Sequence, residues 1–506
     1  MIFYRQDATD DPTHLLCGRS DHDLSGNVIN TELGQMSEEF ATVQLGDARL
    51  NRRAVRIAEI LAAAPDESFP ALMGDDSELE ALYRFVNNER VDLERLLASH
   101  YEAVARRAAS SGPVIVVHDT TGFSFGGETH REGLGRMKSG GADGTQGYYA
   151  HMALVASAET GIPLGVIGVV PVFRDGPVVP YPDLRSKRHD RVREFERWGT
   201  LIETSWSRLS GSNVIHVMDR EADAYELFCQ LAETKQHFVI RSRGDRMLDV
   251  PWGDKKLPRH LYEAIERGRY VMTREVQLST KRSDRLARLR KAPGRMMRVA
   301  KLEVLATHVN VRHPTFIGGE SRSDSSLPRS VSLNVVHAYE VDAPRGQKPV
   351  EWTLLTTLPI DTVAHVEAVI DSYRRRWLIE EYFKALKTGC AYEKRQLESK
   401  HALLNALALF VPISWRLLAL RHLARESPDS LASEILSPRQ LHILRARGKL
   451  RLSNRPTARE AMLAVAAEGG HIKNNGDPGW QVLGRGYEKL LTMELGYVVA
   501  KKRAKM

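Results

Sequence analysis

The spacing of apolar and polar residues changes along the chain and divides it into regions. Residues 1–35 are polar, acidic and aperiodic, which predicts a disordered leader. Residues 36–105 carry apolar side chains at helical spacing, and residues 401–506 return to that spacing. Between them, residues 106–400 mix strand-length apolar runs with helical stretches. We therefore expect a helical region, a mixed region and a second helical region.

The mixed region carries the pattern that decides the fold class. Three strand-length runs come first, followed by a helix, a strand, a helix and a further strand. These elements are expected at residues 113–119, 147–157, 161–173, 194–207, 213–219, 222–234 and 237–243. Clustered strands pair as an antiparallel meander, whereas alternating strands and helices give parallel pairs. The order predicts a mixed α/β fold with a ribonuclease-H-like sheet, followed by a strand at 351–359 and a long helix from about 361 to 387.

Composition excludes several classes of protein. Of the 506 residues, 42% are hydrophobic and 27% charged, which is ordinary for a soluble globular chain. No stretch approaches the roughly 18 uninterrupted apolar residues of a membrane helix, and the first residues lack a signal-peptide core. Cys17, Cys229 and Cys390 lie far apart, which disfavours a disulfide framework or a thiolate zinc site. We expect a cytoplasmic protein with no membrane partner.

The distribution of charge indicates a polyanionic partner. The net charge is +8, but residues 246–301 hold 16 Lys and Arg against 6 Asp and Glu, whereas residues 1–40 hold 2 against 8. A basic block of this kind is typical of nucleic-acid contact. Arg49, Arg52 and Arg53 lie on the polar face of an expected helix in the N-terminal region, where they suit DNA binding. A solvated helix face explains those three arginines equally well.

Two aspartates follow apolar strands. Asp119 is expected at the end of the first strand and Asp219 at the end of the fourth. Ligand sites gather at the carboxyl ends of strands in open sheets, so the two carboxylates can share a metal if their strands are neighbours. The alternative is that each aspartate caps the next turn.

A third group lies on the expected long helix. At about 100° per residue, Tyr373, Arg376, Glu380, Lys384 and Lys387 fall on one narrow face. This face suits a metal-binding carboxylate flanked by cations for phosphate oxygens. A solvated helix with ion pairs four residues apart is the alternative.

Three carboxylates without a His or Cys cluster favour a hard cation, Mg²⁺ or Mn²⁺, over zinc. Two such ions about 4 Å apart can activate an attacking oxygen and stabilise the leaving oxygen in a displacement at phosphorus.

Several motifs occur in the order found in one family. They are HDTT (118–121), DREAD (219–223), FVIRSR (238–243) and the spaced Tyr, Arg, Glu and Lys of residues 373–387. Together they resemble the bacterial DDE transposases of the insertion-sequence-four family, in particular the Tn-five-type enzymes. LGDARLNRR (45–53), YRFVNN (83–88) and GWQVLGRGYEKL (479–490) extend the similarity to about residues 37–495. The acidic leader has no counterpart in the family.

The resemblance implies roles for these residues. Asp119, Asp219 and Glu380 would be the catalytic triad that holds two Mg²⁺ ions. Residues that would contact the phosphate backbone near the cleaved end are Tyr373, Arg376, Lys384, Lys387 and Arg241, and Trp352 would stack on a base flipped from that end. The domains would be a helical DNA-end-binding domain (36–105), a ribonuclease-H-like catalytic domain (106–400) with a β-rich insertion (246–345), and a helical dimerisation domain (401–506).

The activity that the resemblance implies is cut-and-paste transposition of DNA, by a protein associated with the nucleoid when bound. A homodimer would bind double-stranded transposon ends, cleave them through a hairpin and join the 3′ ends to target DNA. One alternative is a ribonuclease-H-like nuclease or resolvase, which cleaves without joining. Another is a catalytically silent, transposase-derived DNA-binding inhibitor, against which the intact carboxylates argue.

Overall fold

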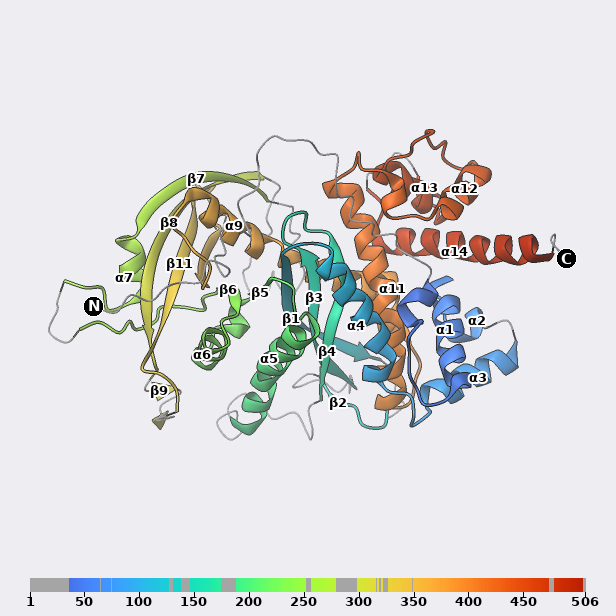
Figure 1. Ribbon diagram of the computed structural model, residues 1–506, viewed down its shortest axis with the longest axis horizontal. Helices are drawn as coiled ribbons and strands as arrows, with labels where there is room; N and C mark the ends of the chain where they lie inside the picture. Colours follow the sequence, from blue (N-terminus) through green and yellow to red (C-terminus); the bar gives the residue numbers. More distant parts are fainter. Residues whose placement is uncertain are drawn as a thin grey trace. The chain divides into compact units, whose positions relative to one another are not determined.

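The chain folds as a mixed α/β protein, as its sequence predicts (Figure 1). A computed structural model describes residues 36–503 apart from residues 64, 74, 127–130, 138–145, 174–187, 252–255, 279–297, 315, 318–319, 322–325, 348 and 473–476. The leader expected at residues 1–35 lies outside the described residues. Among the described residues, those of 213–376 form the first compact unit, and those of 36–212 with those of 377–503 form the second.

Helices open the second unit. They are η2 (Met36–Phe40), α1 (Ala48–Ala63), α2 (Phe69–Leu72), α3 (Asp76–Val86) and α4 (Leu93–Ala109). Asp75 and Asp92 begin α3 and α4, because their side chains accept hydrogen bonds from backbone N–H groups of the first turn. The apolar faces of these helices supply buried residues such as Leu61, Leu82 and Leu97.

The sheet of the second unit is antiparallel. It contains β1 (Val114–Phe125), β2 (Gly135–Arg136), β3 (Gln146–Ser157) and β4 (Pro163–Val172). β3 pairs with both β1 and β4, which confirms the predicted meander. Helix α5 (Arg188–Arg208) packs against β3 and β4.

The prediction that β1 ends at Asp119 is wrong. The strand continues for six residues to Phe125, because its pairing with β3 is unbroken as far as Phe125 opposite Gln146. Beyond Asp119 the burial alternates, with Thr121, Phe123 and Phe125 buried and the residues between them partly exposed. This alternation is that of a half-buried strand.

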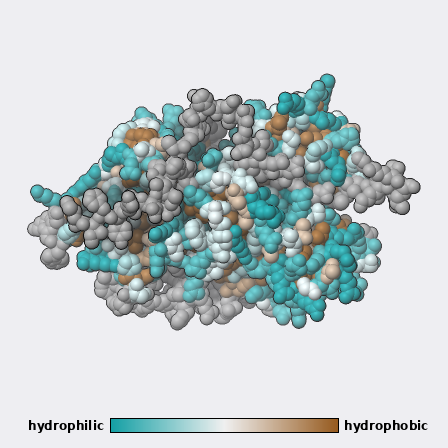
Figure 2. Space-filling view, in the orientation of Figure 1, coloured by the Kyte–Doolittle hydropathy of each residue, from teal (hydrophilic) through white to brown (hydrophobic). Residues whose placement is uncertain are grey.

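The second unit ends in helices, of which α11 is the core. The helices are α10 (Trp377–Lys384), η5 (Ala385–Gly389), η6 (Tyr392–Lys394), α11 (Lys400–Glu426), η7 (Ala432–Glu434), α12 (Pro438–Arg447), α13 (Ala458–Glu468) and α14 (Trp480–Arg503). In the described part of the chain, α11 alone is long and apolar enough to cross a membrane, but 94% of its most apolar stretch is buried inside the protein. It packs against α4, β4 and α13. The described surface in Figure 2 is largely hydrophilic, with hydrophobic residues in small separate areas.

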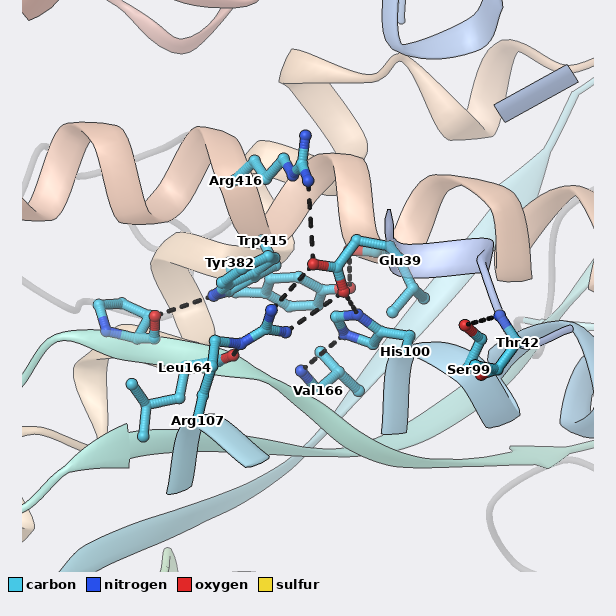
Figure 3. A network of polar contacts seen from close by, with 12 residues as sticks. Glu39, Thr42, Ser99, His100, Arg107, Leu164, Val166, Tyr382, Trp415 and Arg416 are labelled. Atoms are coloured by element: carbon cyan, nitrogen blue, oxygen red, sulfur yellow. Dashed lines mark hydrogen bonds and ion pairs between the residues drawn. The ribbon is translucent and has the colours of Figure 1, made fainter. Parts of the chain in front are cut away.

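A buried polar network joins the N-terminal helices to α11 within the second unit (Figure 3). The Glu39 carboxylate contacts His100 at 2.5 Å, Arg107 at 2.9 Å and Arg416 at 3.8 Å. His100 Nε2 accepts a hydrogen bond from Val166 N, so its Nδ1 carries the proton donated to Glu39. Burial would raise the pKa of Glu39, but the charge of Arg107 and the hydrogen bond from His100 hold it well below its ordinary value.

Glycine is required where β4 approaches this network. Gly165 has a φ of +138°, and an added Cβ would lie 2.3 Å from Cγ2 of Val104 and 3.2 Å from the His100 ring. Any larger residue would push β4 away from α4.

The first unit contains a parallel strand pair. Its elements in this part are β5 (Val214–Met218), η4 (Arg220–Ala222), α6 (Tyr225–Glu233) and β6 (His237–Arg241). β5 is buried along its whole length and pairs parallel with β6. This confirms the predicted crossover, and an antiparallel meander followed by a parallel pair is the strand order of the ribonuclease-H-like class.

Antiparallel strands extend the sheet of the first unit. They are β12 (Glu351–Thr356), β11 (Ser330–Val341), β8 (Arg298–Arg312) and β7 (Arg269–Leu278), paired successively from β6 outward, with a separate hairpin of β9 (Phe316–Ile317) and β10 (Glu320–Ser321). Helix α9 (Val363–Arg374) packs against β5, β6, β11 and β7, and α7 (Leu261–Glu266) packs against β8.

Candidate active site

Asp219 lies at the carboxyl end of β5, as predicted. The strand ends at Met218, and the Asp219 side chain accepts a hydrogen bond from Glu221 N at 2.8 Å, which begins η4. The aspartate therefore does cap a turn, and it is still partly exposed. The parallel register places Met218 opposite Ile240, so Asp219 and Arg241 share one edge of the sheet.

Arg241, Trp352 and Tyr373 come together at this edge of the first unit. The Arg241 guanidinium donates to the Glu351 carbonyl at 2.7 Å, directly before Trp352. The rings of Trp352 and Tyr373 meet edge to face with centroids 5.7 Å apart. We refer to Asp219, Arg241, Trp352 and Tyr373 as the first-unit cluster.

Two aspartates of the acidic motif that follows β5, Asp219 and Asp223, have different environments. Asp223 is 2% exposed in its side chain and receives hydrogen bonds from Arg246 Nε at 2.9 Å and from Arg243 N. It therefore fixes the backbone that leaves β6, whereas Asp219 remains at the strand end. The motif DREAD (219–223) by itself does not distinguish the structural role of Asp223 from the partly exposed position of Asp219.

The prediction of one continuous helix through Tyr373 and Lys387 is wrong. Helix α9 ends at Arg374 and α10 begins at Trp377, with Arg376 N donating to Tyr373 O in a three-residue turn. A five-residue π-helical turn, η5, then carries Lys387. Both departures from 3.6 residues per turn break the assumed 100° spacing. Tyr373 and Arg376 belong to the first unit, whereas Glu380, Lys384 and Lys387 belong to the second.

Asp119 lies within β1 of the second unit and is held by its neighbours. Its Oδ1 accepts a hydrogen bond from Thr120 N at 2.7 Å. The Thr120 hydroxyl lies 3.0 Å from Nδ1 of His151 on β3, its cross-strand partner. His118, the other neighbour, stacks on His151 with ring centroids 6.0 Å apart.

The motif HDTT contains His118, but the sequence predicts no role for either histidine. Both are fully buried, and His151 also lies 4.2 Å from the Trp198 ring. Burial lowers the pKa of His151 well below its ordinary value, and the charge of Arg197 adds to this effect. The His151 imidazole is therefore neutral, and it lies on β3, next to the strand that carries Asp119. The only signal in the sequence was a histidine in each of two neighbouring apolar runs.

Glu380 lies on α10, which packs against β1 within the second unit. The segment after α10 is attached to the same strand. Lys387 Nζ donates to the Gly122 carbonyl at 2.6 Å, and Glu393 accepts from Ser124 N at 2.8 Å. Burial lowers the pKa of Lys387, and the charge of Glu393 opposes this shift. We refer to Asp119, Glu380 and Lys387 as the second-unit cluster.

Lys384 lies apart from these contacts. It is exposed, forms an ion pair with Glu381 at 2.5 Å and lies over the Trp377 ring. Its predicted contact with the DNA backbone stays a prediction.

The carboxylates offer oxygen donors, which suit a hard divalent cation. Among the residues that the structure describes, no group of three or more His, Cys, Asp or Glu side chains is arranged to hold a metal ion. The meeting of Asp119, Asp219 and Glu380 at shared metal ions therefore stays a prediction, with Asp219 in one unit and the other two in the second.

The three N-terminal arginines lie on α1. Arg49 is 84% exposed and approaches Asp47 at 3.4 Å. Arg52 is exposed and Arg53 partly exposed, and neither forms an ion pair with another described residue. Arg56, by contrast, is paired with Glu78.

Part of the basic block at 246–301 stabilises the first unit. Arg274 pairs with Asp371 at 2.6 Å, and Arg298 pairs with the buried Glu340 at 2.7 Å. Arg269 donates to the Ile360 carbonyl. Some of the positive charge in this block is therefore neutralised within the protein and is not available to bind a partner.

The mixed α/β fold is consistent with the ribonuclease-H-like class, and Asp219 follows a buried strand of its sheet. Two stretches of the chain match families of known proteins: residues 35–91 match the transposase DNA-binding family and residues 187–411 match the transposase DDE domain. These matches support a DDE transposase with a DNA-binding domain. Such domains generally use divalent metal ions.

The matched stretches include some of the candidate residues but not all of them. The DNA-binding match includes Arg49, Arg52 and Arg53, and the DDE match includes Asp219 and Glu380 but begins after Asp119. Among solved structures, the chain is similar to a piggyBac transposase in a synaptic complex with hairpin DNA, with 11% identity and a TM-score of 0.33 over 88% of this chain and 78% of that one. At that TM-score the likeness carries no argument.

Proposed function

We propose that this protein is a cut-and-paste DNA transposase of the insertion-sequence-four family, similar to the Tn-five-type enzymes. It binds double-stranded transposon ends as a homodimer, cleaves them through a hairpin and joins the freed 3′ ends to target DNA in the cytoplasm. The observation that carries the proposal is that each unit holds some of the carboxylates and DNA-contacting side chains that this activity requires. The first unit brings Asp219 to the same edge as Arg241, Trp352 and Tyr373, and the second packs the helix of Glu380 against the strand of Asp119.

The side chains divide the work by their chemistry. Asp119, Asp219 and Glu380 would hold two Mg²⁺ ions, which when bound activate the attacking oxygen and stabilise the leaving one. Arg241, Arg376 and Lys387 are cations that suit phosphate oxygens, and they would fix the strand in line for displacement. Lys384 would add a contact with the backbone. Tyr373 would contact the phosphate backbone, and Trp352 would stack on a base flipped from the end, since aromatic rings stack on bases of any sequence.

The binding of DNA ends is assigned to α1. Arg49, Arg52 and Arg53 present guanidinium groups within the stretch that matches a transposase DNA-binding family. Arginine binds phosphate groups in bidentate fashion, and exposed arginines retain this capacity.

A triad test uses the purified protein, Mg²⁺ and DNA that contains the element's ends. We expect Asp119→Asn, Asp219→Asn and Glu380→Gln each to lower the cleavage rate by roughly a thousandfold or more while the protein still binds the ends. Glu381→Gln is the matched control, because Glu381 is the next residue of the same helix and pairs with Lys384. Cleavage at the wild-type rate by any one triad variant would reject the triad.

The alternatives are separated by the products. A nuclease or resolvase would cleave the ends but leave no joint between the processed 3′ end and target DNA. A transposase-derived inhibitor would bind the ends without cleaving them under any metal condition. A joined product that disappears with the triad variants supports transposition.

A further inference from the structure

A second basic surface lies outside the candidate active site, around the end of α12. Residues 438–459 contain seven Lys and Arg and no Asp or Glu. This is the most one-sided charge of any stretch of its length among the C-terminal helices, and the proposed roles of the active site and of α1 do not use it.

The chain reverses at this point and gathers the cations. Helix α12 ends at Arg447 and is followed by Gly448, which has a left-handed φ of 66°. The Arg445 guanidinium then donates to the carbonyls of Ser453 at 3.2 Å and Asn454 at 2.9 Å, so the following loop lies against the helix end. We call residues 445–455 the basic turn; its cations are Arg445, Arg447, Lys449, Arg451 and Arg455.

The basic turn is fixed to α13 by a buried carboxylate. Arg447 and Lys449 reach the same oxygen of Glu468 at 3.4 and 3.3 Å, and the Glu468 side chain is only 2% exposed. Glu460 lies nearby but is occupied by Ser453 and by its own helix cap. Five cations against these two carboxylates leave an excess of positive charge.

Two cations of the basic turn remain available. Arg451 and Arg455 are exposed, and neither forms an ion pair or hydrogen bond with another residue in the described part of the chain. An ordinary surface would place acids beside them. Glu460, which contacts Ser453 between them, is already held by the Ser453 hydroxyl and by its helix cap, so the charges of Arg451 and Arg455 suit a polyanion.

We infer that the basic turn binds the phosphate backbone of a double-stranded DNA segment outside the transposon end. The inference rests on the proposed function, because that function requires the protein to hold DNA beyond the end itself. The turn contains no aromatic residue, so it lacks the stacking platforms that single-stranded nucleic acids require. Exposed arginines that contact phosphates give binding without preference for sequence.

The test measures binding of the full-length protein to two labelled duplexes, one with the transposon end and one of random sequence. The variant is Arg451→Gln with Arg455→Gln, which removes two exposed, unpaired cations and leaves the contacts of Arg445 and Glu468 intact. The matched control is Lys235→Gln with Arg345→Gln, two exposed cations in turns of the first unit. Melting curves check that both variants remain folded.

We expect the first double variant to weaken binding of the random duplex roughly tenfold and to reduce the slope of log K against log salt by about 2, since each lost phosphate contact removes about 0.9. The control should change neither value. Equal losses of duplex binding in the two double variants would overturn the inference. Single-stranded DNA and vesicles of phosphatidylcholine and phosphatidylserine serve as two further probes. A loss of binding confined to either of these probes would also overturn it.

Wild-type protein that binds the end duplex but not the random duplex would also overturn the inference and leave the proposed function standing. Wild-type protein that binds neither duplex would reject both.

Discussion

The indole of Trp352 and the phenol of Tyr373 meet edge to face, with ring centroids 5.7 Å apart and planes inclined by 63°. Tyr373 is buried and Trp352 is only partly so. The tyrosine therefore supports the tryptophan from behind, and the tryptophan keeps an accessible surface. A supported but exposed ring is suited to stacking on a base.

We predict that Trp352→Ala weakens binding of end-containing DNA by about 1–3 kcal/mol, the usual contribution of one base stacked on an aromatic side chain. Fluorescence anisotropy with labelled end DNA measures this loss. Trp352→Phe should retain most of the affinity because it keeps a ring. Trp206→Ala, at an exposed tryptophan on α5, should have no effect, and an equal loss in this control would contradict the stacking role.

The contact between Thr120 and His151 predicts a positioning effect on Asp119. Thr120→Val removes the hydroxyl 3.0 Å from His151 Nδ1 and leaves a buried nitrogen unpaired, which costs about 1–3 kcal/mol. The backbone N–H that binds Asp119 Oδ1 is kept, but the strand next to Asp119 loses its side-chain contact with β3, so we expect the cleavage rate to fall about tenfold while the affinity for end DNA stays unchanged. Single-turnover kinetics and a binding titration separate the two quantities. A loss of affinity without a loss of rate would contradict this role.

The buried network in Figure 3 predicts a large effect on stability. Glu39→Gln removes the charge that Arg107 and Arg416 share, and a buried ion pair that loses one partner costs about 3–5 kcal/mol. Urea unfolding measures the free energy. The matched control is Glu38→Gln, because Glu38 is the preceding residue and is exposed. Similar losses in both variants would show that the network is unimportant.

His216 predicts a dependence of stability on pH. Burial lowers its pKa from 6.5 to about 4, and its hydrogen bond with Gln236 opposes the shift. The unfolded chain therefore binds a proton below pH 6.5 while the folded chain does not until about pH 4. The stabilisation is complete above pH 6.5 and is lost as the pH falls toward 4, by roughly 3 kcal/mol in total.

We expect His216→Gln to flatten the fall in unfolding free energy between pH 7 and pH 4, as measured by urea titrations at several pH values. His308→Gln, at an exposed histidine of the same unit, is the control. The same pH profile in wild type and His216→Gln would refute the assignment.

The sequence predicted the strand that ends at Asp219 because a short apolar run was followed at once by acids. It failed for β1, where the apolar run stops at Asp119 but the strand does not. The signal was present in the alternation of Thr121, Phe123 and Phe125 with polar or small residues, which marks a half-buried strand.

Other features could not be predicted from local patterns. The partners of Glu39 are 61, 68 and 377 residues away, so nothing near it indicates that its charge is buried. The π-helical turn η5 packs against α11 and α14, which are later in the chain, so its shape is not apparent from the residues near it.

The position of the Lys387 ammonium depends on the number of residues in the π-helical turn Ala385–Gly389. An α-helical turn needs one residue fewer, so a deletion within this segment would allow the backbone to tighten. Every later side chain would then rotate by about 100°, and the ammonium would leave the Gly122 carbonyl. A shortened segment would therefore uncouple the end of this helix from the strand of Asp119.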